Sequence, residues 1–143
     1  FSSKGSRHLG QRHLELDGTI QPIFYSSDEA DALGLTGLSF LPFEQVRPQC
    51  FDLIKGKRTP SYFKFVFLLS PKNLERTLLS THSSFTPEDI TGMFINLKFQ
   101  QKKLLLTTGI SYRIFSVDKS LDQEWDSLVK RFLTAHEISF EEL

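Results

Sequence analysis

The run at residues 62–69, YFKFVFLL, constrains the fold of this chain more than any other segment. It is aromatic and almost evenly apolar, which is typical of a strand buried within a sheet rather than of an exposed edge. We therefore predict a central strand here. The sequence also contains 14 Phe among its 143 residues. Because Phe is among the most buried side chains, this content predicts an aromatic core.

The patterns around this strand alternate between those of helices and those of strands. Two short helices are expected, one at 27–33 with Ser27 as cap and one at 48–54 that starts from Pro48. A third helix should begin at Ser70-Pro71, with Leu74 and Leu78 on one face. The last and longest helix should be capped by Asp118 or by a Ser120–Gln123 capping box. Besides the strand at 62–69, a hairpin is expected over 13–24, and further strands at 92–100, 104–107, 110–115 and 138–140. Gly109 is expected to separate the strand at 104–107 from the strand at 110–115. This order predicts an α+β fold with helices packed on a mixed, mainly antiparallel sheet.

The length of the chain suits one domain rather than two. Residues 1–12 contain Ser, Gly and basic residues without hydrophobic periodicity, so we expect a flexible N-terminal arm. Residues 13–143 are expected to form a single α+β domain. The sequence begins at Phe1 rather than Met, so it is left open whether this is a fragment that lacks upstream residues.

Charge and cysteine content limit the compartment and the partners. Lys plus Arg and Asp plus Glu each number 17, so the formal net charge is zero. A dedicated nucleic-acid binder usually has a basic surplus, although a balanced chain can still carry a local basic patch. The single cysteine, Cys50, allows no disulfide within the chain and fits a reducing compartment. With no apolar stretch of membrane-spanning length and no visible signal peptide, we expect a cytoplasmic protein with no membrane contact.

No motif in the sequence assigns an enzyme activity. The four histidines are not paired with Cys or carboxylates at metal-ligand spacing, so we predict no metal and no cofactor. Cys50 falls on the apolar face of a predicted helix, which favours a buried thiol over a nucleophile. A non-enzymatic module is therefore favoured. The alternative is a small enzyme whose site combines loop residues such as Asp52, His82, Thr107, Thr108 and Asp118.

Basic residues give the one positive functional signal. Lys55, Lys57 and Arg58 surround a predicted turn, with Lys64 and Arg113 as supporting residues. Lys98, Lys102 and Lys103 form a second group, and Tyr62 and Tyr112 are the aromatic residues nearby. Such a surface could bind an acidic protein or nucleic acid through charge-assisted hydrogen bonds. Two alternatives stay open, since lysines keep sheet edges soluble and the charge separation along the chain could drive formation of a homodimer or a larger assembly.

Several stretches resemble an uncharacterised family of unknown function from Clostridia-type Firmicutes. They are LELDG at 14–18, RPQCFDLIKGKRTP with the following FKFVFLLS, GMFINLKF, and TTGISYRIFSVDKSLDQEWD. The resemblance covers most of residues 13–143 and implies a small bacterial cytoplasmic protein, but it implies no activity and no functional residue. Separately, the expected order of strand, helix and three strands over 61–115 resembles one unit of a sliding clamp, and such an analogy of topology is a poor guide to function.

Overall fold

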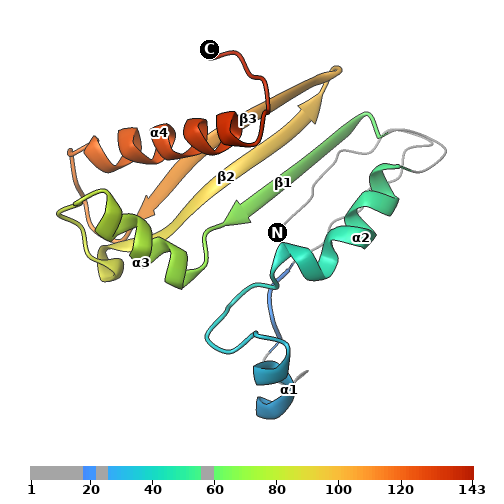
Figure 1. Cartoon of the computed structure of the whole chain (residues 1–143), viewed down its shortest axis with the longest axis horizontal. Helices are drawn as coiled ribbons and strands as arrows, with labels where there is room; N and C mark the ends of the chain where they lie inside the picture. Colours follow the sequence, from blue (N-terminus) through green and yellow to red (C-terminus); the bar gives the residue numbers. More distant parts are fainter. Residues whose placement is uncertain (1–17, 22–25, 56–59) are drawn as a thin grey trace. The chain divides into compact units, whose positions relative to one another are not determined.

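The computed structural model describes residues 18–21, 26–55 and 60–143. Within these ranges the chain forms four α-helices, one short 3-10 helix and a three-stranded antiparallel sheet in the order β1-β2-β3 (Figure 1). The predicted α+β class is therefore confirmed. The predicted arm at 1–12, most of the predicted hairpin over 13–24, and the predicted site residues Lys57 and Arg58 lie outside the described residues.

The backbone divides into two compact units. The first unit contains the described residues up to Leu68 together with 96–106, and the second contains 69–95 together with 107–143. Two strands, β2 (Ile90–Gln100) and β3 (Lys103–Tyr112), have residues in both units. The predicted single domain over 13–143 stays a prediction, which an unfolding experiment with one probe in each unit can test.

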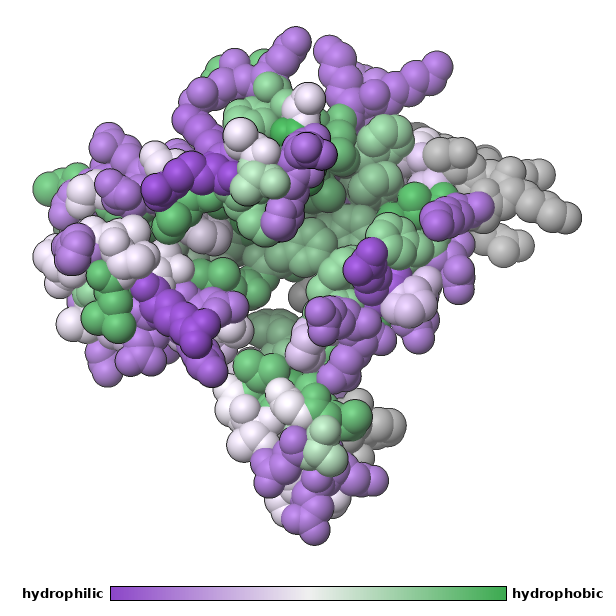
Figure 2. Space-filling view, viewed as in Figure 1, coloured by the Kyte–Doolittle hydropathy of each residue, from purple (hydrophilic) through white to green (hydrophobic). Residues whose placement is uncertain are grey.

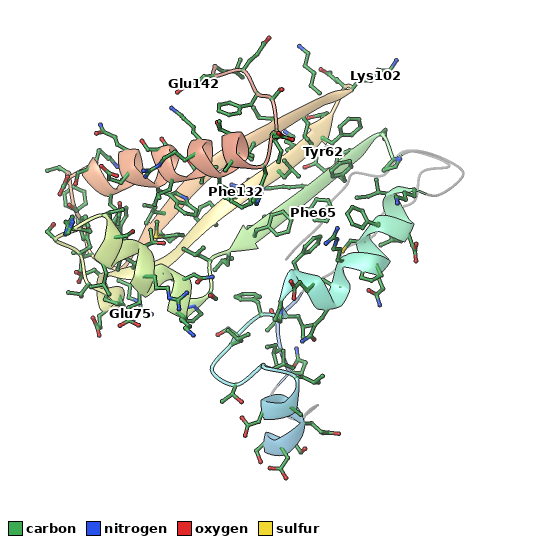
Figure 3. All side chains as sticks on the ribbon, in the orientation of Figure 1. Tyr62, Phe65, Glu75, Lys102, Phe132 and Glu142 are labelled. Atoms are coloured by element: carbon green, nitrogen blue, oxygen red, sulfur yellow. The ribbon has the colours of Figure 1, made fainter. Side chains whose placement is uncertain are left out.

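An aromatic cluster forms the core of the first unit. In β1 (Tyr62–Leu68) the side chains of Phe63, Phe65 and Phe67 share one face, as alternation along a strand requires. Phe65 and Cys50 of helix α2 (Phe43–Ile54) are both buried at the centre of the cluster, and Phe65 is labelled in Figure 3. The partly buried residues packed around them are Phe43, Val46, Ile54, Phe63, Phe67 and Leu97. The predicted aromatic core and buried thiol are thus present.

Helix α2 begins five residues before the predicted start at Pro48. Proline inside a helix removes one hydrogen bond and crowds the carbonyl four residues earlier, at a cost of about 3 kcal/mol. The ring of Phe43 packs edge-on against two phenylalanines of β1, with its centroid 5.0 Å from that of Phe67 and 6.3 Å from that of Phe65. Burial of one such side chain contributes roughly 1.5–3 kcal/mol, and each aromatic pair adds about 0.5–1.5 kcal/mol. Packing of the first turn therefore offsets the proline, which local propensity could not reveal.

The short helix α1 (Ser27–Ala32) is held by a capping box, and its cap is Ser26 rather than the predicted Ser27. The backbone N–H of Glu29 donates to Ser26 Oγ at 3.2 Å, and the N–H of Ser26 donates to the Glu29 carboxylate at 2.9 Å. The second bond lowers the pKa of Glu29. No residue of α1 is buried, and Figure 2 shows hydrophilic side chains over its outer end. Thr19 forms an isolated antiparallel bridge with Phe40.

In the second unit, helix α3 (Pro71–Ser80) follows the prediction closely. Ser70 Oγ accepts from the N–H of Asn73 at 3.3 Å, Pro71 occupies the first turn, and Leu74 and Leu78 are buried. A 3-10 turn, η1 (Pro87–Asp89), leads into β2, where Met93 is 0% exposed. Among the described strands, β2 lies between the two others and β1 is at the edge, so the central position of residues 62–69 stays a prediction.

β3 is one continuous strand, whereas two strands separated by Gly109 were predicted. Glycine in a strand often marks a close approach by another group rather than a break. Here that group is Phe94 of β2, whose ring lies where a side chain at position 109 would project. The observed order from β1 onward is therefore strand, helix, strand, strand, which is one strand fewer than the sliding-clamp analogy assumed.

Helix α4 (Ser120–Ala135) packs through Leu121, Trp125 and Val129, all of which are buried. The indole N–H of Trp125 donates to the carbonyl of Phe94 at 3.2 Å. The predicted Ser120–Gln123 capping box is not formed, because the cap position is Lys119 and Ser120 is already helical. Asp118 instead accepts from the N–H of Ser120 at 2.9 Å, which lowers the pKa of Asp118. Residues 138–140 are not a strand, contrary to prediction.

Candidate functional site

The charged residues of the sheet are all of one kind. Each strand contains one charged side chain, and these are Lys64 in β1, Lys98 in β2 and Lys103 in β3. None of the three strands contains Asp or Glu. The sheet is therefore positively charged even though the whole chain is neutral.

The pairing of β1 with β2 brings two of these lysines together. The rings of Phe63 and Phe99 stack with centroids 5.0 Å apart, which makes these residues cross-strand neighbours. One position further along, Lys64 lies opposite Lys98. Residues opposite one another in an antiparallel pair point to the same face, about 5 Å apart at their Cβ atoms. Both lysines therefore lie on the sheet face that is opposite to Phe63 and its cluster.

The β2–β3 hairpin adds the third lysine to this face. Gln101 and Lys102 form a two-residue turn, with φ angles of 52° and 61°. Such a turn pairs Gln100 with Lys103, and places both on the same face as Lys98. We define the lysine face as Tyr62, Lys64, Lys98, Gln100, Lys103 and Leu105, all within the first unit. Figure 3 labels Tyr62 and Lys102 near the same end of the sheet.

The lysines of this face are held without a carboxylate. Nζ of Lys98 lies 5.8 Å from the ring centroid of Tyr62, within the range of a cation–π contact. Lys64, Lys98 and Tyr62 are half-buried, and Lys103 is exposed. Among the described residues none of the three lysines forms an ion pair with Asp or Glu. Their charges are therefore available to an anion from outside the chain.

A second basic surface follows the exposed side of α2. The guanidinium carbon of Arg47 lies 5.3 Å from the ring centroid of Phe51, and Nζ of Lys55 lies 5.4 Å from it. The spacing of four residues places all three side chains on one side of the helix. Because α2 packs on the phenylalanine face of β1, this stripe and the lysine face belong to opposite sides of the sheet.

The five predicted site residues therefore do not form one described cluster. Lys55 ends α2 on one side of the sheet, and Lys64 lies on the other. Arg113 belongs to the second unit, where its backbone N–H donates to the carbonyl of Asp89 at 2.8 Å. Lys57 and Arg58 lie outside the described residues. Of the original set, Lys64 is the residue that shares a face with other described lysines.

Comparison with known proteins gives a family but no activity. A model of DUF5721, described as a family of unknown function, matches residues 9–141. The chain belongs to the DUF5721 family. No curated protein and no solved structure matches it. The resemblance to a family of unknown function is thus confirmed, and no residue role comes with it. In the described part of this DUF5721 chain, no helix is both long and apolar enough to cross a membrane.

Three of the five residues of the enzyme alternative do not lie in loops of this DUF5721 member, because Asp52 belongs to α2 and Thr107 and Thr108 belong to β3. Thr108 Oγ1 donates to the Asp126 carboxylate, and Asp118 accepts from the start of α4. His82 is exposed in a turn with φ of 51°. These contacts explain Thr108 and Asp118 without catalysis. Across the described ranges, no group of three or more His, Cys, Asp or Glu side chains could hold a metal ion.

Cys50 is 2% exposed, and its burial raises the pKa of the thiol. A reactive cysteine needs the opposite, namely an accessible thiol with a lowered pKa. The interpretation of Cys50 as a small core side chain agrees with its position beside Phe65.

From the sequence, Lys64 and the group of Lys98 and Lys103 form one basic face only on the condition that their strands are neighbours. A signal was present in the sequence, because no acidic residue occurs between Asp52 and Glu75 or between Asp89 and Asp118. These two acid-free segments contain all three strands. The missing step was the strand register, which decides which residues share a face.

Proposed function

We propose that this chain is a non-enzymatic binding module that holds an anionic partner on its lysine face. The observation that supports the proposal most is that the charged residues of the three strands are all lysines and share one face of the sheet. Each ammonium has three hydrogen-bond donors, so together they can bind several phosphate or carboxylate oxygens. Because the proposed activity is binding alone, the lysines need no catalytic residue or cofactor beside them.

A purely solubilising role explains these lysines less well. Lysine protects strands at the edge of a sheet, but Lys98 lies in β2, between the two other described strands. Like charges directly opposite one another destabilise a sheet, on the scale of roughly 0.2–1 kcal/mol per pair. The Lys64–Lys98 pair carries this cost without a carboxylate among the described residues to relieve it. An anion bound between them would remove the repulsion.

The test uses inorganic polyphosphate, which presents charge and no other recognisable group. Calorimetric titration at low salt should give binding to the native chain that weakens as salt is added. The double variant Lys64→Gln/Lys98→Gln should bind polyphosphate at least tenfold more weakly, which is a loss of about 1.4 kcal/mol in binding free energy. The matched control is Lys72→Gln/Lys119→Gln, which removes the same charge from exposed positions outside the lysine face. Equal weakening in both variants would show that only net charge matters and would refute the proposal.

The basic turn remains a second proposed contact. Lys55, Lys57 and Arg58 would bind the same partner where it extends beyond one sheet face, and the supporting role of Arg113 stays a separate prediction. What supports this is the Arg47–Phe51–Lys55 stripe, in which two cations share one ring. A charge-reversed Lys57→Glu/Arg58→Glu variant should then bind polyphosphate less tightly than the native chain. Unchanged affinity in this variant would remove the turn from the site and leave the lysine face intact.

We also propose that the protein works in the cytoplasm of a bacterium of the Clostridia-type Firmicutes. The resemblance described above and the single reduced cysteine support this assignment. Fractionation of cells that express the native gene, with detection by antibody, tests it. Recovery in the soluble cytosolic fraction is expected, and recovery in the culture medium or the membrane fraction would contradict it.

A further inference from the structure

From the composition of the lysine face we infer that its anionic partner is a single-stranded nucleic acid. This inference rests on the proposed function and goes beyond it by naming the class of partner. An acidic peptide would need only the lysines. The face also presents the half-buried ring of Tyr62 and the amide of Gln100. An aromatic ring beside lysines on a sheet surface is the combination that stacks bases while neutralising phosphates.

The cross-strand pairs arrange these groups in two neighbouring rows. Tyr62, Gln100 and Lys103 form one row across the three strands, and Lys64, Lys98 and Leu105 form the next. Neighbouring strands lie about 4.8 Å apart, so each row is roughly 10 Å long. A phosphate backbone can contact Lys64 and Lys98 along one row while a base reaches Tyr62 in the other. Bases in a duplex are stacked inside it and cannot do this, so the partner is single-stranded.

The cation–π contact seen in the free protein does not prevent base stacking. Nζ of Lys98 lies 5.8 Å from the Tyr62 centroid. A half-buried contact of this kind is worth between about 0.5 and 2 kcal/mol. Stacking of a base on an aromatic side chain is worth about 1–3 kcal/mol, and the released ammonium gains a phosphate contact in addition. A base can therefore replace the ammonium, which then becomes free to bind a phosphate. Lys98 therefore contacts the Tyr62 ring in the free protein and a phosphate in the complex.

The test compares a fluorescently labelled ten-nucleotide single strand, in DNA and RNA forms, with the matching duplex, with polyphosphate and with polyglutamate. The single strands should bind more tightly than the duplex and polyglutamate. If the three lysines contact phosphates, the logarithm of the association constant should fall with the logarithm of salt concentration with a slope of about −2. Lys98→Gln should reduce that slope by about 0.7.

Tyr62 separates this inference from the proposed function. Tyr62→Leu should weaken binding of the single strands about tenfold more than it weakens binding of polyphosphate, since only the single strands have bases that stack on the ring. Tyr62→Phe keeps the ring and should bind like the native chain, which controls for any loss of folding in the leucine variant. The two strand chemistries should respond alike, because no contact specific to the 2′-hydroxyl is invoked.

The possible failures are distinguishable. If Tyr62→Leu binds the single strands like the native chain, or if polyglutamate or the duplex binds as tightly, the nucleic-acid inference is overturned and the proposed anion site stands. If Lys64→Gln/Lys98→Gln binds both polyphosphate and the single strands as tightly as the native chain, the proposed function is overturned as well.

Discussion

Gly109 in β3 faces Phe94 in β2, and the phenyl ring covers the space into which a side chain at position 109 would project. A Cβ atom there would lie less than 3.0 Å from two ring carbons, closer than real Cβ contacts. The carbonyl of Phe94 also accepts the indole N–H of Trp125, so its backbone is held on the helix side as well. Glycine at position 109 therefore allows β3 to continue past the Phe94 ring as one strand.

Gly109→Ala should destabilise the fold by about 1–3 kcal/mol, since the new methyl group must push the ring out of its place. Urea unfolding followed by Trp125 fluorescence measures the change. Phe94→Leu removes the obstacle, so the double variant Phe94→Leu/Gly109→Ala should lose less stability than the two single losses added together. Strict additivity would contradict the proposed steric cause.

The thiol of Cys50 should be inert in the folded chain. Burial raises its pKa, and the side chain is 2% exposed, so both the thiolate and the access needed for reaction are absent. A thiol reagent such as DTNB at pH 8 should react only as fast as the protein opens, whereas the chain in urea should react at once. Since Cys50 is the single cysteine, the colour change reports on this residue alone. Rapid, complete reaction of the native chain would contradict its place in the core.

Tyr112 should ionise at a higher pH than an ordinary tyrosine. Burial raises its pKa first, and the hydroxyl that donates to the Asp122 carboxylate at 2.8 Å raises it further. A raised folded pKa stabilises the protein below the unfolded value of about 10, and this stability is lost as pH rises further. The ultraviolet titration of the native chain minus that of Tyr112→Phe isolates this residue. Tyr112→Phe should lower the free energy of unfolding by about 1 kcal/mol at neutral pH. A difference titration whose midpoint is that of an ordinary tyrosine would contradict the contact with Asp122.

The two compact units should unfold together. β2 and β3 run through both without a break, so unfolding one unit would leave unpaired strand backbone in the other. Trp125 fluorescence reports on the second unit and Cys50 thiol exposure on the first. We predict coincident urea midpoints for the two probes, as expected for the single domain over 13–143. Midpoints that differ beyond error would show two separately stable units.

Prediction from sequence succeeded where local chemistry decides the structure. The Ser70-Pro71 start and the buried Leu74 and Leu78 of α3 follow from capping and periodicity alone. It failed where a distant contact decides. The first turn of α2 depends on Phe43 packing against Phe65 and Phe67, and the continuity of β3 depends on Phe94. Neither contact is visible in a local window of sequence.

The candidate site illustrates the same limit. Lys64 and Lys98 were each visible as basic residues, but their adjacency depends on register. That register follows from the Phe63–Phe99 stack and from a hairpin turn at Gln101 and Lys102. Both turn residues have positive φ without being Gly, Asn or Asp, so the usual hairpin signature was absent. Only after pairing is known do the lysines fall on one face.

The central claim, that an anion binds at the lysine face, is tested most directly by mapping where polyphosphate acts on the chain. Backbone amide shifts in two-dimensional NMR, followed during titration at low salt, report on each residue separately. We predict that the largest shifts fall on Tyr62, Lys64, Lys98 and Lys103, and that they are absent in Lys64→Gln/Lys98→Gln. Shifts confined to Arg47, Phe51 and Lys55 on α2, or no saturable shifts at all, would contradict the account.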